Sequence, residues 1–510
     1  RFWFGLWAVA SVRGFDTRAE RRQYWSIETS LPQVLALNSL RREISGMNKF
    51  VRLGFVSILV WALVSLVAGP LAAQDPSDAG ASADSAVIRP PKLDFTTHTL
   101  PNGLQVILLE DHTVPVINLQ VWYHVGAKDE RPGRTGFAHL FEHLMFKGSA
   151  HVGPDEHSRI VEAMGGFDNA STYDDFTNFY ETFPSNALER VLWLEADRMG
   201  SLNVDQANFT SEREVVKEER RVRIENEPYG YLEEDLRAAA FTVHAYHHTA
   251  IGSMADLDKA TLADVRDFFS TFYKPNNATL VIVGDFNSDR ALAWTTKYFA
   301  GIPASVKPIP RLDDPEPLQT AQRVVNKSYS NTPLPAVVIG YKIPAIFTPD
   351  SYPLSLTANI LAGGESSRLY QVLVYKDRIA VQAAGFGNFT EDPNLFWTYA
   401  ILNAGQTPAA GEKALVDVLD SLKSEPIGAH ELEKAKNQQI SADILGRDTD
   451  EDKAVALANA AVLGKDPNLV NTDLDRYLRV TSADIQRVAA QYFVPEHSTV
   501  LIVTTKPSAR

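Results

Sequence analysis

The spacing of apolar residues between positions 137 and 145 predicts a short amphipathic helix. Apolar side chains recur at i, i+3, i+4, i+7 and i+8. A helix turns by about 100° per residue, so His139 and His143 fall together on the opposite face. Two imidazoles at i and i+4 can therefore converge on one ion. The apolar residues are Phe137, Leu140, Phe141, Leu144 and Met145.

A longer pattern of apolar and polar positions occurs twice. In each copy a Thr followed three residues later by Asp opens a helix, an aromatic residue and a Pro end it, and a β-branched strand follows. Thr481 lies 220 positions after Thr261, too far for a solenoid period, so the match indicates two homologous domains. The first copy comprises Thr261–Val265, Phe272–Pro275 and Thr279–Val283, and the second comprises Thr481–Ile485, Tyr492–Pro495 and Thr499–Val503.

Short strand patterns alternate with helical ones, which predicts an α+β fold. Leu104–Leu109 and Val116–Tyr123 are two of the predicted strands, although periodicity does not give their order in a sheet. Between the two copies, residues 302–320 carry five prolines and several charges, a composition typical of an extended linker. We therefore predict one domain at residues 94–301 and a second at residues 321–510.

The N-terminal part has the features of a targeting segment. Residues 47–73 contain a short basic region, an uncharged apolar stretch and a small-residue cleavage region that ends at Ala73, which predicts a signal peptide and export. The apolar stretch is also long enough for an uncleaved membrane anchor. Residues 74–93 are predicted to form a flexible tether. Residues 1–46 precede this internal start, and we interpret them as a spurious or unassigned upstream segment.

The amino-acid composition limits the metal ligands and the partners that the chain can have. The chain contains no cysteine, so disulfides and thiolate metal ligands are excluded. The formal net charge of −14 argues against nucleic acid as a partner. A metal in this chain would have to be held by His and carboxylate side chains.

Residues 139–143 read His-Leu-Phe-Glu-His, the inverted form of the zinc-peptidase signature H-E-x-x-H. The two histidines would be zinc ligands, and Glu142 would lie beside them without binding the metal. Zinc in a catalytic site needs a third protein ligand and keeps a fourth position for water. Residues 212–221 are predicted to form a second helix, rich in carboxylates, that could supply this ligand. The alternative interpretation of such a run is a solvated charged face.

At these two segments the chain resembles the pitrilysin/insulinase family of inverted zincins. That family completes its metal site with a glutamate about 76 residues after the second histidine, in the pattern E-R-x-x-V-x-x-E. Glu219 lies 76 positions after His143, and Glu212 opens the pattern. The resemblance implies one Zn²⁺ per chain held by His139, His143 and Glu219. It also implies that Glu142 is the general base and that Glu212 orients the ligands.

Two further segments match the family in its contacts with substrate. Residues 165–172 are similar to G-G-x-x-N-A-x-T, which implies that Asn169 and Ala170 bind the peptide backbone. The alternative is a glycine turn that enters an ordinary strand. In the second half, Arg368 and Tyr375 are seven residues apart, a spacing that puts both on one face of an α-helix. The resemblance implies that this pair holds the substrate and the developing oxyanion.

The histidines at positions 244, 247 and 248 form another cluster. A metal site is possible there, but no acidic or cysteine partner shares a ligand spacing with these residues, so we interpret the segment as a polar loop.

The resemblance covers residues 94–505 and is greatest with short two-domain bacterial members related to mitochondrial processing peptidase. It implies two homologous domains, each a mostly antiparallel sheet with helices on one face, that form half of a clam-shell chamber. We therefore expect a periplasmic zinc endopeptidase of a Gram-negative bacterium that cleaves unfolded peptides. Because one chain carries both site motifs, a homodimer is expected, and a heteromeric partner of the same family stays open. The alternative function is a non-catalytic or assembly subunit.

Overall fold

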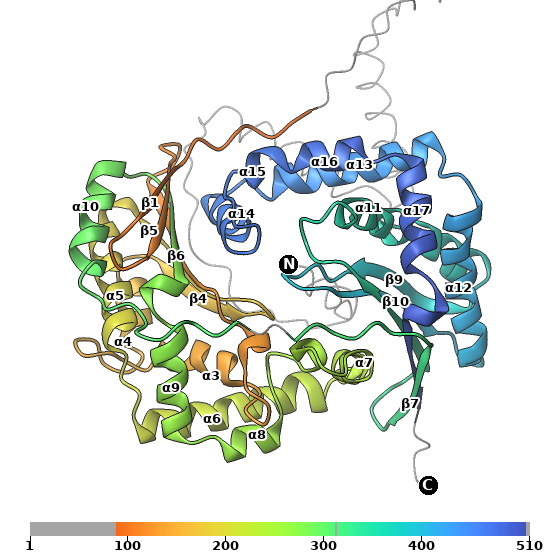
Figure 1. The fold of residues 1–510 in the computed structure, drawn as a ribbon, viewed down its shortest axis with the longest axis horizontal. Helices are drawn as coiled ribbons and strands as arrows, with labels where there is room; N and C mark the ends of the chain where they lie inside the picture. Colours follow the sequence, from red (N-terminus) through yellow and green to blue (C-terminus); the bar gives the residue numbers. More distant parts are fainter. Residues whose placement is uncertain (1–87, 312–313, 506–510) are drawn as a thin grey trace, which may run out of the picture. The chain divides into compact units, whose positions relative to one another are not determined.

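The computed structural model describes residues 88–311 and 314–505, which contain two β-sheets (Figure 1). The predictions for residues 1–46 and 47–73, and for most of the tether at 74–93, lie outside the described residues. Within the described part, no helix combines the length and the apolar character that a membrane crossing requires.

The first sheet has the strand order β1-β2-β6-β3-β5-β4. Its neighbours are antiparallel except for β2 and β6, which run parallel. Among the strands that the structure describes, β4 therefore lies at one edge of the sheet and pairs with β5 alone. The strands are β1 (Thr96–Thr99), β2 (Gln105–Glu110), β3 (Val116–Tyr123), β4 (Phe167–Thr172), β5 (Thr177–Pro184) and β6 (Ala278–Gly284).

The second sheet repeats this arrangement with five strands in the order β7-β11-β8-β10-β9. Again one pair is parallel, β7 with β11, and the other pairs are antiparallel. The prediction of two related, mostly antiparallel sheets is confirmed. The strands are β7 (Arg323–Tyr329), β8 (Ala336–Ile343), β9 (Ala380–Gly387), β10 (Asn394–Leu402) and β11 (Ser498–Thr505).

The sequence repeat marks equivalent places in the two sheets. Its helices are α9 (Leu262–Phe272) and α17 (Ser482–Tyr492), and each begins with a capping box in which a Thr and an Asp bond each other's backbone amides. After each helix a proline opens a single 3₁₀ turn that leads into β6 or β11, the strand that belongs to the parallel pair of its sheet. The order of elements predicted for each copy is therefore correct.

The remaining helices surround the sheets (Figure 1). In the first half they are α3 (Phe137–Leu144), α4 (Glu156–Ala163), α5 (Leu188–Ser201), α6 (Gln206–Arg220), α7 (Leu232–Ala240), α8 (Met254–Lys259) and α10 (Ser288–Phe299). In the second half they are α11 (Ser351–Ala362), α12 (Pro408–Ser424), α13 (Ala429–Leu445), α14 (Asp450–Val462), α15 (Leu469–Thr472) and α16 (Leu474–Arg479). Short 3₁₀ turns are η2 (Ala127–Asp129), η3 (Ser185–Ala187), η5 (Ala245–His247), η6 (Pro275–Asn277) and η8 (Pro495–His497), and two segments are π-helical, η4 (Arg221–Glu225) and η7 (Tyr370–Lys376).

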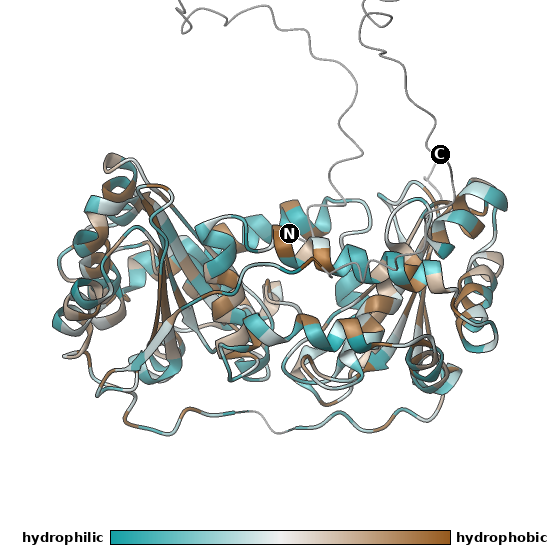
Figure 2. Cartoon of the chain, turned by 90° about the horizontal axis from the view of Figure 1, so that it is seen from above, coloured by the Kyte–Doolittle hydropathy of each residue, from teal (hydrophilic) through white to brown (hydrophobic). Residues whose placement is uncertain are grey.

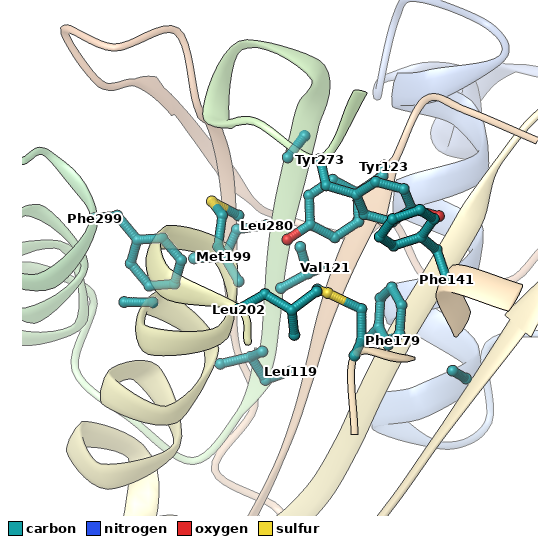
Figure 3. Packing of buried hydrophobic residues seen from close by; sticks show 14 of the residues in the cluster. Leu119, Val121, Tyr123, Phe141, Phe179, Met199, Leu202, Tyr273, Leu280 and Phe299 are labelled. Atoms are coloured by element: carbon teal, nitrogen blue, oxygen red, sulfur yellow. The ribbon is translucent and has the colours of Figure 1, made fainter. Parts of the chain in front are cut away.

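One face of the first sheet packs against helices from its own half of the chain. Along β3, alternate residues Leu119, Val121 and Tyr123 are fully buried and belong to the same core cluster as Phe141 of α3 and Met199 of α5 (Figure 3). Alternation with period two is expected where side chains of a strand point to opposite faces. The hydropathy colouring shows largely apolar strands in both sheets (Figure 2).

The other face of the first sheet is covered by a helix from the second half. Ile107 of β2 and Val281 of β6 share a buried cluster with Ala454 and Leu457 of α14. Strands buried on both faces are apolar at nearly every position, as in the Leu-Val-Ile-Val run of β6.

The second sheet receives a helix from the first half in return. Leu236 and Ala240 of α7 cluster with Val338 of β8 and Leu501 of β11, whereas the opposite face packs against helices of its own half. Gly340 of β8 makes room for this helix, since a Cβ there would lie 3.0 Å from Leu236 Cδ2. The two halves thus exchange helices. Each sheet has helices packed against both faces, whereas the prediction placed helices on one face only.

The segment between α10 and β7 carries neither helix nor strand in its described residues, 302–311 and 314–320. It is nevertheless attached to the first half. The Glu316 carboxylate accepts hydrogen bonds from the backbone amides of Thr242 and Val243, at 2.8–2.9 Å, and of His244, at 3.1 Å. These bonds lower the pKa of Glu316 to about 2, although burial acts in the opposite direction.

The exchanged helix α7 offers a test of this packing. Leu236→Ala is expected to lower the free energy of unfolding by about 2–5 kcal/mol, because it leaves a cavity in a cluster that joins both halves. Leu445→Ala on α13 is the control: Leu445 is 62% exposed, and its loss should cost less than about 0.5 kcal/mol. Denaturant unfolding measures both. Equal effects of the two substitutions would contradict the exchange.

Candidate metal centre

A buried carboxylate holds the start of α3. Glu130 accepts hydrogen bonds from the backbone amides of Gly136 and Ala138, both at 2.8 Å. An acidic group at a helix N-terminus satisfies amides that have no partner within the helix. Gly136 has φ 92°, and a Cβ there would lie 3.0 Å from the Ile251 carbonyl oxygen, so the turn into α3 requires glycine. Sequence analysis did not identify the role of Glu130. The only indication in the sequence is an acidic residue six positions before Gly136.

The predicted amphipathic helix forms as expected. Its five apolar residues are each no more than 2% exposed. On the other face, the rings of His139 and His143 have centroids 4.9 Å apart and are nearly perpendicular. Burying the apolar stripe under the sheet therefore turns both imidazoles toward α6.

Helix α6 brings Glu219 to the two histidines. Glu219 Oε2 lies 3.2 Å from His143 Nε2 and 3.5 Å from His139 Nε2. A tetrahedral zinc site with metal–ligand distances of about 2.0–2.2 Å separates its ligand atoms by roughly 3.3 Å. One ligand atom from each of the three residues lies within 4.8 Å of the others. This donor set and its spacing fit a divalent zinc ion.

The two histidines differ in their electrostatic environment. Burial lowers the pKa of His139 to about 4. Burial also acts to lower the pKa of His143, but the contacts with the Glu212 and Glu219 carboxylates outweigh it and raise the value to about 9. Without a metal, His143 is therefore a cation that lies between these two carboxylates at neutral pH.

Glu212 lies on the other side of His143. Its Oε2 is 3.7 Å from His143 Nδ1, and its Oε1 is 3.3 Å from Lys147 Nζ. The residue is 3% exposed. Although burial opposes it, contact with His143 and Lys147 lowers the pKa of Glu212. A carboxylate at Nδ1 fixes the ring orientation of a histidine whose Nε2 faces a metal site.

Glu142 lies beside the cluster and next to the edge strand β4. Its Oε2 accepts a hydrogen bond of 2.6 Å from the Thr172 hydroxyl, at the end of β4. Burial raises the pKa of Glu142. A carboxylate whose pKa is shifted upward is suited to accepting and returning a proton near neutral pH.

Asn169 and Ala170 lie in the middle of β4. Two glycines precede the strand, and Gly165 has φ 85°, so a glycine turn does enter it. The Asn169 side-chain oxygen accepts a hydrogen bond of 2.8 Å from the Ala170 amide. Because β4 pairs only with β5, its other edge has no partner strand among the described residues. The proposed contact of these two residues with substrate stays a prediction.

Arg368 and Tyr375 are placed differently from each other. Arg368 bonds the Glu431 carboxylate at 2.7 and 2.8 Å and the Ser421 hydroxyl at 2.9 Å, whereas Tyr375 is 69% exposed. Most of the segment between them is the π-helix η7, which has more residues per turn than an α-helix. Seven residues therefore do not make two complete turns, and the one-face argument does not apply. Their roles stay predictions.

The histidines at 244, 247 and 248 belong to no group with ligand spacing among the described residues. A second such group does occur, formed by His157, Glu181 and Glu195 in the core. The Arg198 guanidinium lies among them, 2.9 Å from Glu195 Oε2 and 3.0 Å from Glu181 Oε1. That buried group already contains its cation, so it is a structural network that sequence reasoning did not find.

The sequence comparisons agree with this geometry. A sequence model described as "Insulinase (Peptidase family M16)" matches residues 105–253, and one described as "Peptidase M16 inactive domain" matches residues 259–439. Zinc protease PqqE of Helicobacter pylori is 35% identical over 408 residues, which cover 79% of this chain and 91% of that protein. The chain belongs to the insulinase family, peptidase family M16. The first of its two matched segments contains the residues of the metal centre.

Solved structures of this family share the fold. The crystal structure of a protease from Helicobacter pylori is 34% identical, has a TM-score of 0.78, and is matched over 81% of this chain and 100% of that chain. The periplasmic protease PqqL of Escherichia coli has a TM-score of 0.68 at 18% identity, matched over 81% of this chain and 48% of that chain. This M16 chain thus corresponds in fold to about half of PqqL.

The raised pKa of His143 has a consequence for stability without metal. A histidine whose pKa is higher in the folded state contributes stability fully below its unfolded pKa of about 6.5, and loses it as pH rises to the folded value. His143→Gln should therefore destabilise the metal-free protein at pH 6, and the difference should vanish as pH rises through about 9. Denaturant unfolding across this range measures it. His430→Gln is the control, since His430 is fully exposed; a His143→Gln effect that grows with pH would contradict the assignment.

Proposed function

We propose that this M16 chain is a zinc-dependent endopeptidase. The observation that carries the proposal is the convergence of His139, His143 and Glu219 with Glu142 beside them. A zinc ion held by these three residues supplies Lewis acidity, which activates water and polarises a peptide carbonyl. The absence of cysteine from the sequence agrees with a ligand set of imidazoles and one carboxylate.

Glu142 then acts as the general base. It accepts the proton of the attacking water and donates a proton to the leaving amine. The Thr172 hydroxyl holds one carboxylate oxygen at 2.6 Å, so the other oxygen is oriented for this transfer. Glu212 orients His143 through Nδ1 and does not take part in the reaction.

The edge of β4 that has no partner strand among the described residues is the proposed binding place for substrate. An extended peptide can add to a sheet edge through its main chain, so affinity depends little on sequence. Asn169 and Ala170 would contact the peptide there, and Thr172 ends the same strand beside Glu142. Unfolded peptides are therefore the proposed substrate class.

Arg368 and Tyr375 are proposed to act in a second copy of the chain. In this chain the Arg368 guanidinium is bonded to Glu431 and Ser421 of its own half. The chain matches 48% of the PqqL chain, so two copies would correspond to about the length of that protein. We propose a homodimer in which the pair reaches the neighbour's metal centre, in an exported, periplasmic protein. A non-catalytic subunit is a weaker proposal, because the ligand set and Glu142 are complete.

Glu142→Gln is the decisive test. The amide cannot accept a proton, so peptide hydrolysis should fall by about 10²–10⁴-fold while bound zinc stays the same. Hydrolysis of a quenched unfolded peptide and elemental analysis of the protein measure the two quantities. Wild-type protein that binds zinc yet hydrolyses no peptide, alone or as a dimer, would favour the non-catalytic subunit. Undiminished hydrolysis by the variant would refute Glu142 as the base.

The hydrogen bond from Thr172 gives a second test. Thr172→Val keeps the shape of the side chain but removes its donor, and kcat should fall by roughly 10- to 100-fold because a hydrogen bond to a charged group contributes about 1.5–3 kcal/mol. Thr172→Ser keeps the hydroxyl and is the matched control, with activity near that of the wild type. Equal losses in both variants would mean that the methyl group, and not the hydroxyl, is what the site needs.

A further inference from the structure

The two oxygens of Glu219 have different partners. Oε2 faces both histidines, at 3.2 and 3.5 Å, whereas Oε1 forms an ion pair of 2.9 Å with Arg223 Nη1. The carboxylate is therefore turned so that only one oxygen points to the metal centre. A carboxylate can bind a metal through one oxygen or through both, so something must select the orientation.

Arg223 comes from an irregular place in the backbone. It lies four residues after Glu219, in the π-helix η4 that directly continues α6. Single π-helical turns are rare and occur frequently at functional sites. The Arg223 side chain is 72% exposed while Glu219 is 17% exposed, so the arginine covers the carboxylate from the solvent side.

The same arrangement occurs at the other carboxylate of the site. Glu212 directs Oε2 to His143 Nδ1 and Oε1 to Lys147 Nζ. His143 is thus held between two carboxylates, each of which has its outer oxygen next to a basic side chain. The lysine is 23% exposed, so of the two cations Arg223 lies more in solvent.

We propose that Arg223 is a positioning residue that makes Glu219 a one-oxygen metal ligand. By occupying Oε1 it leaves Oε2 aligned with the two imidazoles and keeps the other positions around the metal free for water and substrate. The inference rests on the proposed zinc site and adds a residue that the zinc motif does not contain. An ion pair with so exposed a partner contributes little to folding, so its effect should be confined to the metal centre.

Zinc affinity tests the proposal. Arg223→Gln should raise the Kd for zinc by about tenfold, the lower end of the effect of residues that support metal ligands, because Arg223 is largely exposed. Competition with a chromophoric chelator measures this in the full protein without any substrate. Arg223→Lys keeps a cation but has only one donor nitrogen. Its Kd for zinc should lie between that of the wild type and that of Arg223→Gln.

Arg221→Gln is the matched control. Arg221 belongs to the same π-helical turn and pairs with Glu218 at 2.7 Å, so the substitution removes the same charge from the same element without touching a ligand. Its Kd for zinc should equal that of the wild type. Equal Kd values for the Arg223→Gln variant and the wild type, or tighter binding by the variant, would overturn the proposal. Equal weakening by both substitutions would overturn it too, since net charge alone would then explain the effect.

Cobalt substitution gives an independent readout of the ligand geometry. Four-coordinate Co²⁺ absorbs more strongly in the visible region than five- or six-coordinate Co²⁺. If Arg223→Gln frees Glu219 to bind through both oxygens, the absorption of the Co²⁺-loaded protein should weaken, while Arg221→Gln leaves it unchanged. Identical spectra for all three proteins would count against the proposal. Failure of the wild type to bind either metal would refute the zinc site itself, which is a separate result.

Discussion

The burial of one face of α3 determines the geometry of the metal centre. Five apolar side chains of this helix lie in the core beneath the first sheet, and the buried Glu130 carboxylate fixes its first turn. Because the apolar face and the first turn of α3 are both fixed, the side chains of His139 and His143 point toward α6. The geometry of the site thus follows from core packing: the face of α3 opposite the apolar stripe carries the proposed ligands.

The charges around the site are arranged in layers. His143 lies between two carboxylates, and each carboxylate has a basic side chain at its outer oxygen, Lys147 for Glu212 and Arg223 for Glu219. Such alternation compensates the cost of placing several carboxylates close together.

Regular helices made much of this site predictable. The four-residue spacing of His139 and His143, and the seven-residue spacing of Glu212 and Glu219, put side chains on common faces because α3 and α6 keep α-helical periodicity there. The same argument failed for Arg368 and Tyr375, since η7 is π-helical. The role of Arg223 could not be predicted, because the residue lies in a run of charged residues typical of a solvated surface. The order of strands and the exchange of α7 and α14 depend on long-range packing; the apolar character of β6 indicates burial on both faces but not which helix provides it.

The exchange of helices has a consequence for how the protein is made. The last strand of the first sheet ends at Gly284. One apolar face of that sheet, however, is covered by packing against α14, which begins at Asp450. During synthesis from the N-terminus, the first half therefore cannot finish folding before α14 has left the ribosome. The two halves acquire their final stability together.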